Sequence, residues 1–372
     1  MAGRFFSRLF GGSGSDDNPI TSIQGHQCKK RRHYQREKKL ASHLYGQYSM
    51  ALVQANVINE DRCQLVSGPL SNDPDGPTGV FVGIYDGHAG DICSQFVLDN
   101  LFNDFKTAIT NQHLQEVNPA IIQQAYLRTE NKFLEHARAN WRHRNWKLAS
   151  TGSCCLSGVV NGNRLYVANA GDSRAVLARW GAGDENVEAV QLSIDYNAND
   201  AESREELRAE HQDDPYLFRV TNGRVRVRDR IEVTRAIGDF YLKYNEFNRY
   251  PLEVRYRHQH PINRPILKAQ PTVETYQLGP NDRFVIFGSQ GLWREVTNEE
   301  AVSVVAASTR SGAARALLKE ALVRASHRNN IQYQELINLP IDLKHYRHED
   351  ISIVILFFDN LPVIAEEMVV EL

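Results

Sequence analysis

The sequence predicts an α+β fold in which antiparallel sheets carry helices on their outer faces. Three observations support this prediction. Short β-rich runs follow one another in pairs, stretches of helical periodicity do the same, and the two kinds of segment do not alternate one for one. A doubly wound parallel sheet would instead require strands and helices in alternation. The chain has 372 residues, of which 42% are hydrophobic and 24% charged, and this composition allows a buried core.

Residues 1–45 are expected to form a disordered or targeting basic tail. A Gly/Ser/Asp linker precedes a run of basic residues, and such a composition cannot bury enough surface to fold alone. The run can be a solvated tail or a patch for nuclear import or an anionic surface. The first segment, MAGRFFSRLF, can be a frayed terminus or a weak targeting element. The basic residues are Lys29, Lys30, Arg31, Arg32, Arg36, Lys38 and Lys39.

Residues 46–360 are expected to form one folded domain, followed by a C-terminal tail over residues 361–372. The predicted strands are Ser49–Val57, Gly79–Tyr85, Ser153–Val160, Arg164–Ala168, Arg174–Leu177, Arg283–Gly288 and Ile351–Phe358. The predicted helices are Ala89–Phe105, Pro119–Ala139, Asp200–His211, Glu299–Ala307 and Ala313–Arg328. Thr297 and Glu300 form a capping box that marks the start of the fourth helix.

Charge and cysteine usage exclude several classes of protein. The 43 Lys and Arg residues nearly balance 45 Asp and Glu residues, so nucleic acid is not an expected partner. The longest apolar runs fall short of the roughly 18 to 20 residues that a transmembrane helix needs. Five cysteines without a CxxC pair favour reduced thiols, and hence an intracellular location in nucleus or cytoplasm, with the plasma-membrane face also open.

Acidic residues follow several of the predicted strands. Asp86, Gly87 and His88 come directly after one strand, Glu60 and Asp61 follow another, and GDSR stands after a third. Because carboxylates are hard oxygen donors and no Cys/His ligand set accompanies them, such a group would suit Mg²⁺ or Mn²⁺ better than zinc. On its own, an Asp-Gly pair is equally typical of a hairpin turn.

The ordered series GIYDGHAG, GSCCLSG, RLYVANAGDSRAVL, VTRAIGD, RFVIFGSQGLW and HEDISIVILFF resembles the motifs of the type 2C metal-dependent protein serine/threonine phosphatases. The resemblance extends over about residues 47–360. Four further segments, SMALVQAN, SREELR, EFNRYPL and RPILKAQPTVE, resemble the plant D clade of that family. The resemblance to the type 2C phosphatases implies a four-layer α-β-β-α sandwich of two antiparallel sheets, with two Mg²⁺ or Mn²⁺ ions in a cleft at one end of the sheets.

The resemblance also implies roles for individual residues. Asp86 would bridge the two metal ions, the Gly87 carbonyl and Glu60 would bind one of them, and Asp172 would match a ligand of a weaker third ion. His88 would be the general acid that protonates the leaving alcohol. These residue types suit phosphoester hydrolysis, because divalent cations neutralise phosphoryl oxygens and lower the pKa of water from about 15.7 to about 7. A histidine with a pKa near about 6.5 can give up a proton at neutral pH.

The sequence departs from the family pattern at several positions. Gln290 stands where the family has a metal-binding aspartate, and Glu349 stands where it has another. Arg294 places a positive charge where an acidic residue is usual. Asn56 stands where the family has an arginine that binds phosphate, but the resemblance to the D clade implies that this change is shared there and carries little weight. Loss of a ligand charge is expected to weaken metal binding by at least roughly 10- to 100-fold. The segment Thr234–Asp239 is interpreted as part of the architecture of the cleft.

Two functions therefore remain open at the level of the sequence. The first is metal-dependent hydrolysis of phosphoserine and phosphothreonine in proteins by a metal-activated water, with reduced activity. The second is a pseudophosphatase that binds phosphoproteins or regulators without catalysis. Phosphoprotein substrates are the expected partners, small inhibitor proteins are implied by the D-clade resemblance alone, and a monomer is expected.

Overall fold

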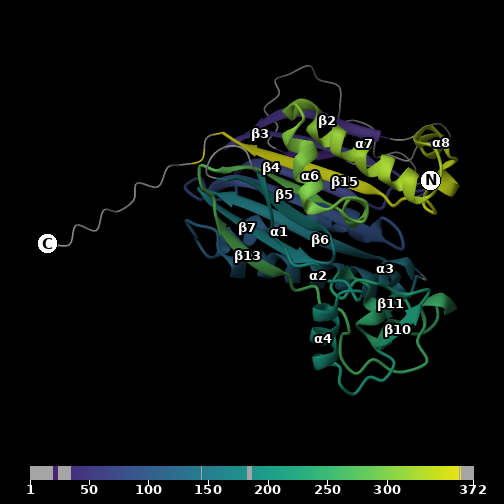
Figure 1. Ribbon diagram of the computed structural model, residues 1–372. Coiled ribbons are helices and arrows are strands. Elements are labelled where there is room, and N and C mark those ends of the chain that lie inside the picture. Colours follow the sequence, from purple (N-terminus) through teal and green to yellow (C-terminus); the bar gives the residue numbers. More distant parts are fainter. Residues whose placement is uncertain (1–19, 24–34, 144, 182–186, 360, 362–372) are drawn as a thin grey trace, which may run out of the picture.

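Two antiparallel sheets stacked face to face form the body of the molecule (Figure 1). The structure, a computed structural model, describes residues 20–23, 35–143, 145–181, 187–359 and 361. The first sheet has the strand order β1-β4-β5-β6-β7-β13, with β12 paired to β6, and the second has the order β2-β3-β15-β14-β8-β9. Strands β10 and β11 form a separate hairpin.

The strands are β1 (Ile20–Ile23), β2 (Gln35–His43), β3 (Gly46–Val53), β4 (Arg62–Pro69), β5 (Thr78–His88), β6 (Gly152–Asn161), β7 (Arg164–Ala170), β8 (Arg174–Trp180), β9 (Val187–Gln191), β10 (Phe218–Thr221), β11 (Arg224–Val227), β12 (Ile237–Gly238), β13 (Thr272–Gln277), β14 (Asp282–Gly288) and β15 (Ile351–Phe358). The helices are α1 (Ile92–Asn111), α2 (Pro119–Trp141), α3 (Lys147–Ser150), α4 (Ala201–Glu210), α5 (Gln290–Trp293), α6 (Asn298–Ala306), α7 (Arg310–Arg328), α8 (Tyr333–Asn338) and α9 (Ile341–Lys344).

Three hydrophobic clusters separate four layers. One cluster fills the space between the two sheets, a second joins the first sheet to α1 and α2, and a third joins the second sheet to α6 and α7. Strand β15 shows why the layers form, because all eight residues of ISIVILFF are buried and only a strand covered on both faces can bury an unbroken apolar run. The predicted four-layer α-β-β-α sandwich is confirmed.

The elements predicted between residues 79 and 358 are all present, with ends displaced by a few residues. The capping box of α6 is confirmed: Thr297 Oγ1 accepts from the Glu300 amide, and Glu300 Oε2 accepts from the Thr297 amide at 2.9 Å. None of the described helices combines the length and the apolar character that a membrane span requires.

The expectation for residues 1–45 needs a correction. Strands β1 and β2 lie inside the predicted tail, where β2 pairs with β3 and β1 pairs with β4. A segment that cannot fold alone can still add a strand to a sheet, because its backbone hydrogen bonds are completed by a neighbour. The targeting element, residues 29–32 of the basic run and residues 362–372 lie outside the described residues.

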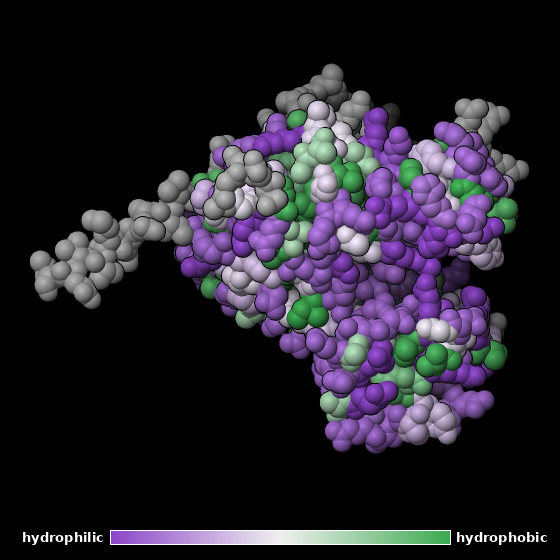
Figure 2. Space-filling view, viewed as in Figure 1, coloured by the Kyte–Doolittle hydropathy of each residue, from purple (hydrophilic) through white to green (hydrophobic). Residues whose placement is uncertain are grey.

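A subdomain, residues 198–267, projects from one end of the sandwich and contains α4, β10 and β11 (Figure 1). It has its own small hydrophobic cluster, which includes Leu207, Val227, Leu242 and Ile266. Figure 2 shows that the same face of the molecule is mainly hydrophilic. The subdomain therefore has a core of its own next to the end of the sheets.

Candidate active site

One pocket brings together every residue that the sequence singled out as catalytic or metal-binding. It has a volume of about 280 Å³ and lies where strands of both sheets end next to the subdomain. Its lining includes Glu60, Asp86, Gly87, His88, Gln290 and Glu349, together with Asp61, Asp172 and Asp350. Residues from five distant parts of the chain therefore meet at one place.

Strand β5 positions the central residues. Its last three residues, Asp86, Gly87 and His88, pair with Cys154, Ser153 and Gly152 of β6, so the ladder fixes their direction up to the edge of the pocket. Position 87 accepts only glycine. A Cβ atom there would lie 2.4 Å from the Glu60 carbonyl oxygen and 2.8 Å from Ser94 Oγ, well inside contact distance. The absence of a side chain thus lets the loop that carries Glu60 approach Asp86.

His88, which is partly buried, forms a hydrogen-bonded pair with Asp239. Its Nε2 lies 2.7 Å from Asp239 Oδ2, and Asp239 is fully buried. Gly152, opposite His88 in the ladder, leaves the space that the pair occupies, since a Cβ there would collide with both side chains. Burial alone would lower the pKa of His88, but the charge and hydrogen bond of Asp239 outweigh it and raise that pKa. Asp239 therefore holds His88 in place and favours its protonated form.

Asp350 fastens the loop between β3 and β4, which carries Glu60. Its Oδ1 accepts from the backbone amides of Ala55 and Asn56 at 2.6 and 3.0 Å, and its Oδ2 accepts from the Glu60 amide at 2.7 Å. Asp350 itself is only 4% exposed. A carboxylate with three backbone donors holds a loop firmly, because hydrogen bonds to a charged group are the stronger kind. Sequence reasoning gave Asp350 no such role.

The carboxylates of the pocket are crowded and short of positive charge. Burial and the charge of Asp350 raise the pKa of Glu60 to about 7 and that of Asp61 to about 8. Burial, with repulsion from Asp61 and Asp172, raises the pKa of Asp86 well above its ordinary value. Asp61 is 1% exposed, and its Oδ2 has no hydrogen-bond partner among the described residues. Buried carboxylates with raised pKa values and an unused oxygen are what a site for a hard cation requires.

The side of the pocket formed by Gln290 and Glu349 is different. The Gln290 backbone amide donates to Asp86 Oδ2 at 2.9 Å, while its side chain brings no charge. Glu349 is turned toward Arg294, whose Nη1 lies 2.5 Å from Glu349 Oε1. Across the described residues, no three Asp, Glu, His or Cys side chains already stand as ligands of one ion. The part of the pocket formed by Glu60 and Asp86 fits a divalent cation. The part around Glu349 does not fit one while Glu349 is paired with Arg294.

Comparison with known proteins identifies the family of this chain. The sequence matches the family description "Protein phosphatase 2C" over residues 53–330. The chain belongs to the protein phosphatase 2C family. It is 42% identical over 323 residues to "Probable protein phosphatase 2C 46" of Arabidopsis thaliana, covering 87% of this chain and 84% of that protein. It is 41% identical over 315 residues to "Probable protein phosphatase 2C 72" of rice, covering 85% of this chain and 79% of that protein.

A solved structure shares the fold. The crystal structure of serine-threonine phosphatase 2C from Toxoplasma gondii aligns with a TM-score of 0.62 at 16% sequence identity, and the alignment covers 88% of this chain and 99% of that one. The family supports metal-dependent protein phosphatase function for the chain. The predicted resemblance to type 2C phosphatases, with relatives in plants, is confirmed.

Two further features of this phosphatase 2C pocket were missed or placed elsewhere by the sequence analysis. Asp239, assigned to the architecture of the cleft, contacts His88 directly. Arg224 and Glu232 of the subdomain also line the pocket. Neither feature has a sequence signal of its own, because each depends on how segments far apart in the chain come together at the pocket. Asp172 lies in the pocket as expected, where it accepts from Asn197 Nδ2 at 2.7 Å.

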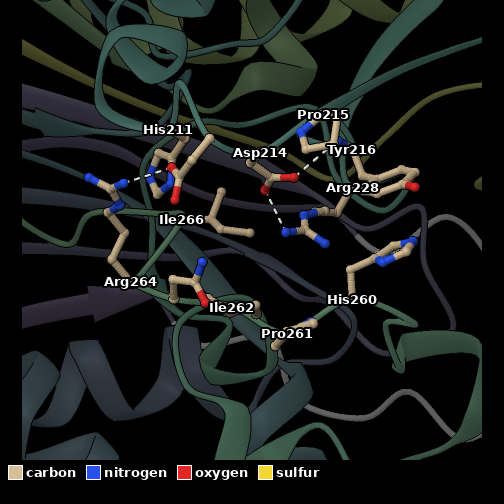
Figure 3. Close-up of a pocket in the computed structure, with 12 residues that line it drawn as sticks. His211, Asp214, Pro215, Tyr216, Arg228, His260, Pro261, Ile262, Arg264 and Ile266 are labelled. Carbon is tan, nitrogen blue, oxygen red and sulfur yellow. Dashed lines mark hydrogen bonds and ion pairs between the residues drawn. The ribbon is translucent and has the colours of Figure 1, made fainter.

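A second pocket of about 190 Å³ lies within the subdomain, and its charged side chains are already paired (Figure 3). Asp213 accepts from Arg264 at 2.7 Å, and Asp214 accepts from Arg228 at 2.5 Å. Tyr216 and His260 stack with ring centroids 3.7 Å apart. Because its ion pairs balance one another, this pocket lacks the excess of carboxylates found around Asp86.

Proposed function

We propose that this chain hydrolyses phosphoserine and phosphothreonine in proteins at the pocket around Asp86. The observation that carries the proposal is that Glu60, Asp61 and Asp86 meet in one pocket with His88, which Asp239 orients. Divalent Mg²⁺ or Mn²⁺, when bound, would neutralise the phosphoryl oxygens and supply hydroxide from water near neutral pH. Two ions are expected, held by Glu60, Asp86, the Gly87 carbonyl, Gln290 and Glu349, with binding weakened near Gln290 and Glu349.

The residues of the chain then have separate tasks. Asp86, with its Oδ2 fixed by the Gln290 amide, and Glu60 supply the negative charge that attracts a cation. His88 gives a proton to the serine or threonine oxygen as the bond from that oxygen to phosphorus breaks, because an alkoxide is a poor leaving group. Asp239 orients His88 and raises its pKa. A His88→Ala variant with full turnover of a phosphopeptide at neutral pH would contradict this assignment.

A pseudophosphatase is the second candidate, and the ion pair of Arg294 with Glu349 favours it. A guanidinium 2.5 Å from a carboxylate oxygen provides the charge that a cation would otherwise provide there. The pocket would then bind a phosphorylated side chain without cleaving it.

Turnover of a phosphopeptide over a wide range of Mn²⁺ concentration separates the two candidates, with wild type and Gln290→Asp measured side by side. We expect wild-type turnover that depends on Mn²⁺, and saturation of Gln290→Asp at a Mn²⁺ concentration roughly tenfold lower or less. Activity confined to Gln290→Asp would support the pseudophosphatase. Turnover that resists a chelator would contradict both.

A further inference from the structure

The hairpin of β10 and β11 carries three arginines on one face. In its register Arg219 lies opposite Arg226 and Thr221 lies opposite Arg224. Residues directly opposite, and residues two apart along a strand, point to the same side of a sheet. Arg219, Arg224 and Arg226 therefore share one face, which we call the arginine face. The other face includes Phe218, Val225 and Val227, which pack on the hydrophobic cluster of the subdomain.

The arginine face begins at the candidate active site. Arg224 lines the pocket that contains Asp86 and His88, and Glu232 lies beside it there. Arg226 follows two residues further along β11, which corresponds to roughly 7 Å for an extended strand. The face thus leads out of the pocket along the surface of the subdomain.

Positive charge on this face is not fully balanced by the chain. Glu232 is shared, since it accepts from Arg224 at 3.1 Å and lies 3.5 Å from Arg226 Nη2. Asp229 lies 3.5 Å from Arg219 and also accepts from Thr221 Oγ1. Two carboxylates therefore serve three guanidinium groups, and both carboxylate contacts of the opposed pair Arg219 and Arg226 are long.

Arg226 and Arg219 both have long ion pairs and exposed side chains. The Arg226 side chain is 40% exposed, and its ion pair with Glu232 spans 3.5 Å. Arg219, directly opposite, is 70% exposed. Like charges placed opposite each other destabilise a sheet. By contrast Arg228, directly after the end of β11, has a side chain that is only 6% exposed. It is paired with Asp214, as Figure 3 shows. The chain thus completes the ion pair of Arg228 but leaves Arg219 and Arg226 facing solvent.

We propose that Arg219 and Arg226 bind an anionic side chain of the substrate next to the phosphoresidue in the pocket. The inference rests on the proposed function, because it takes the pocket as the place of that phosphoresidue. Guanidinium groups form bidentate hydrogen bonds with both carboxylates and phosphates. An extended peptide advances about 3.4 Å per residue, so the second anion would stand about two or three residues from the phosphoresidue. The substrate class is then phosphoproteins with acidic or doubly phosphorylated sites.

The test uses three phosphothreonine peptides that differ only at positions two and three from the phosphothreonine: alanine, glutamate or a second phosphothreonine. Affinity is measured by fluorescence anisotropy and kcat/KM by phosphate release, on the full chain with Mn²⁺. Wild type should prefer both anionic peptides over the alanine peptide by roughly tenfold, and Arg226→Gln and Arg219→Gln should each remove most of that preference. A preference for the doubly phosphorylated peptide alone would identify phosphate, not carboxylate, as the anion bound.

Two controls make the outcome specific. Arg264→Gln removes an equal charge from the same subdomain and should keep the preference, since Arg264 binds Asp213 away from the arginine face. Hydrolysis of p-nitrophenyl phosphate should not change in Arg264→Gln. Equal affinity of wild type for all three peptides, or an equal loss for all three in Arg226→Gln, would overturn the inference. If the anisotropy preference is present but no peptide is hydrolysed, the inference stands and the proposed hydrolysis fails.

Discussion

The excess of buried carboxylates in the pocket should make the metal-free protein less stable as the pH rises. Burial raises the pKa of Glu60 from 4.5 to about 7. A carboxyl group whose pKa is higher in the folded state binds its proton more tightly there, so its contribution to stability is present at low pH and is lost as the pH rises through 7. Between pH 6 and pH 8 this loss amounts to about 1.4 kcal/mol for Glu60.

Urea unfolding of wild type and Glu60→Gln in chelator, at pH 6 and pH 8, measures this loss. His43 and His258 act in the opposite direction, because burial lowers the pKa of each to about 4, but they do so in both proteins. The fall in unfolding free energy between the two pH values should therefore be about 1.4 kcal/mol larger in wild type than in Glu60→Gln. Glu299→Gln, which removes an exposed carboxylate from α6, provides the matched substitution.

Saturating Mn²⁺ adds a second arm to the same experiment. A cation competes with protons for carboxylates, so Mn²⁺ should stabilise wild type more at pH 8 than at pH 6. Identical pH dependence in wild type and Glu60→Gln, or stability that rises with pH more steeply in wild type, would refute the reasoning about the pocket.

Three other substitutions probe separate parts of the structure. Asp239→Asn should lower kcat roughly 100-fold and move the alkaline limb of the pH profile to lower pH, because the charge that raises the pKa of His88 is removed. An alkaline limb at the wild-type pH would contradict the positioning role of Asp239. Arg294→Gln should release Glu349 from its ion pair, and the affinity for Mn²⁺ measured by calorimetry should rise roughly tenfold. An unchanged affinity would mean that the ion pair does not compete with the metal. Phe133→Ala should cost roughly 3 to 5 kcal/mol of unfolding free energy, since Phe133 of α2 is fully buried against Phe96 of α1 and Phe240. A loss below about 1 kcal/mol would show that the core tolerates the cavity.

The sequence predicted those elements whose pattern is local. The apolar run of β15 and the capping box of α6 are set by neighbouring residues, and both were found at the predicted place. The hairpin of β10 and β11 also had a local signal that was not used, namely Asn222-Gly223 between two alternating segments, both with positive φ in the structure. Strand β2 had no such signal, because its place depends on pairing with β3.

In the candidate site, too, features with a local sequence pattern were predictable and contacts between distant segments were not. The motif residues that end β5 were predictable, since a strand end with Asp, Gly and His is visible in the sequence. The contacts that position these residues and shift their pKa values were not predictable. Asp350 holds a loop 290 residues away in the chain, and Asp239 reaches His88 across 151 residues. Such contacts depend on how the sheets stack, and no pattern within one segment records them.

Mn²⁺-dependent hydrolysis of a phosphothreonine peptide by wild type and Asp86→Asn is the measurement that tests the account most directly. Activity of wild type should rise with Mn²⁺ to a plateau and vanish in chelator, and Asp86→Asn should lose roughly 100-fold or more at every Mn²⁺ concentration, because the central carboxylate is gone. Turnover in chelator, or an Asp86→Asn protein as active as wild type, would contradict it.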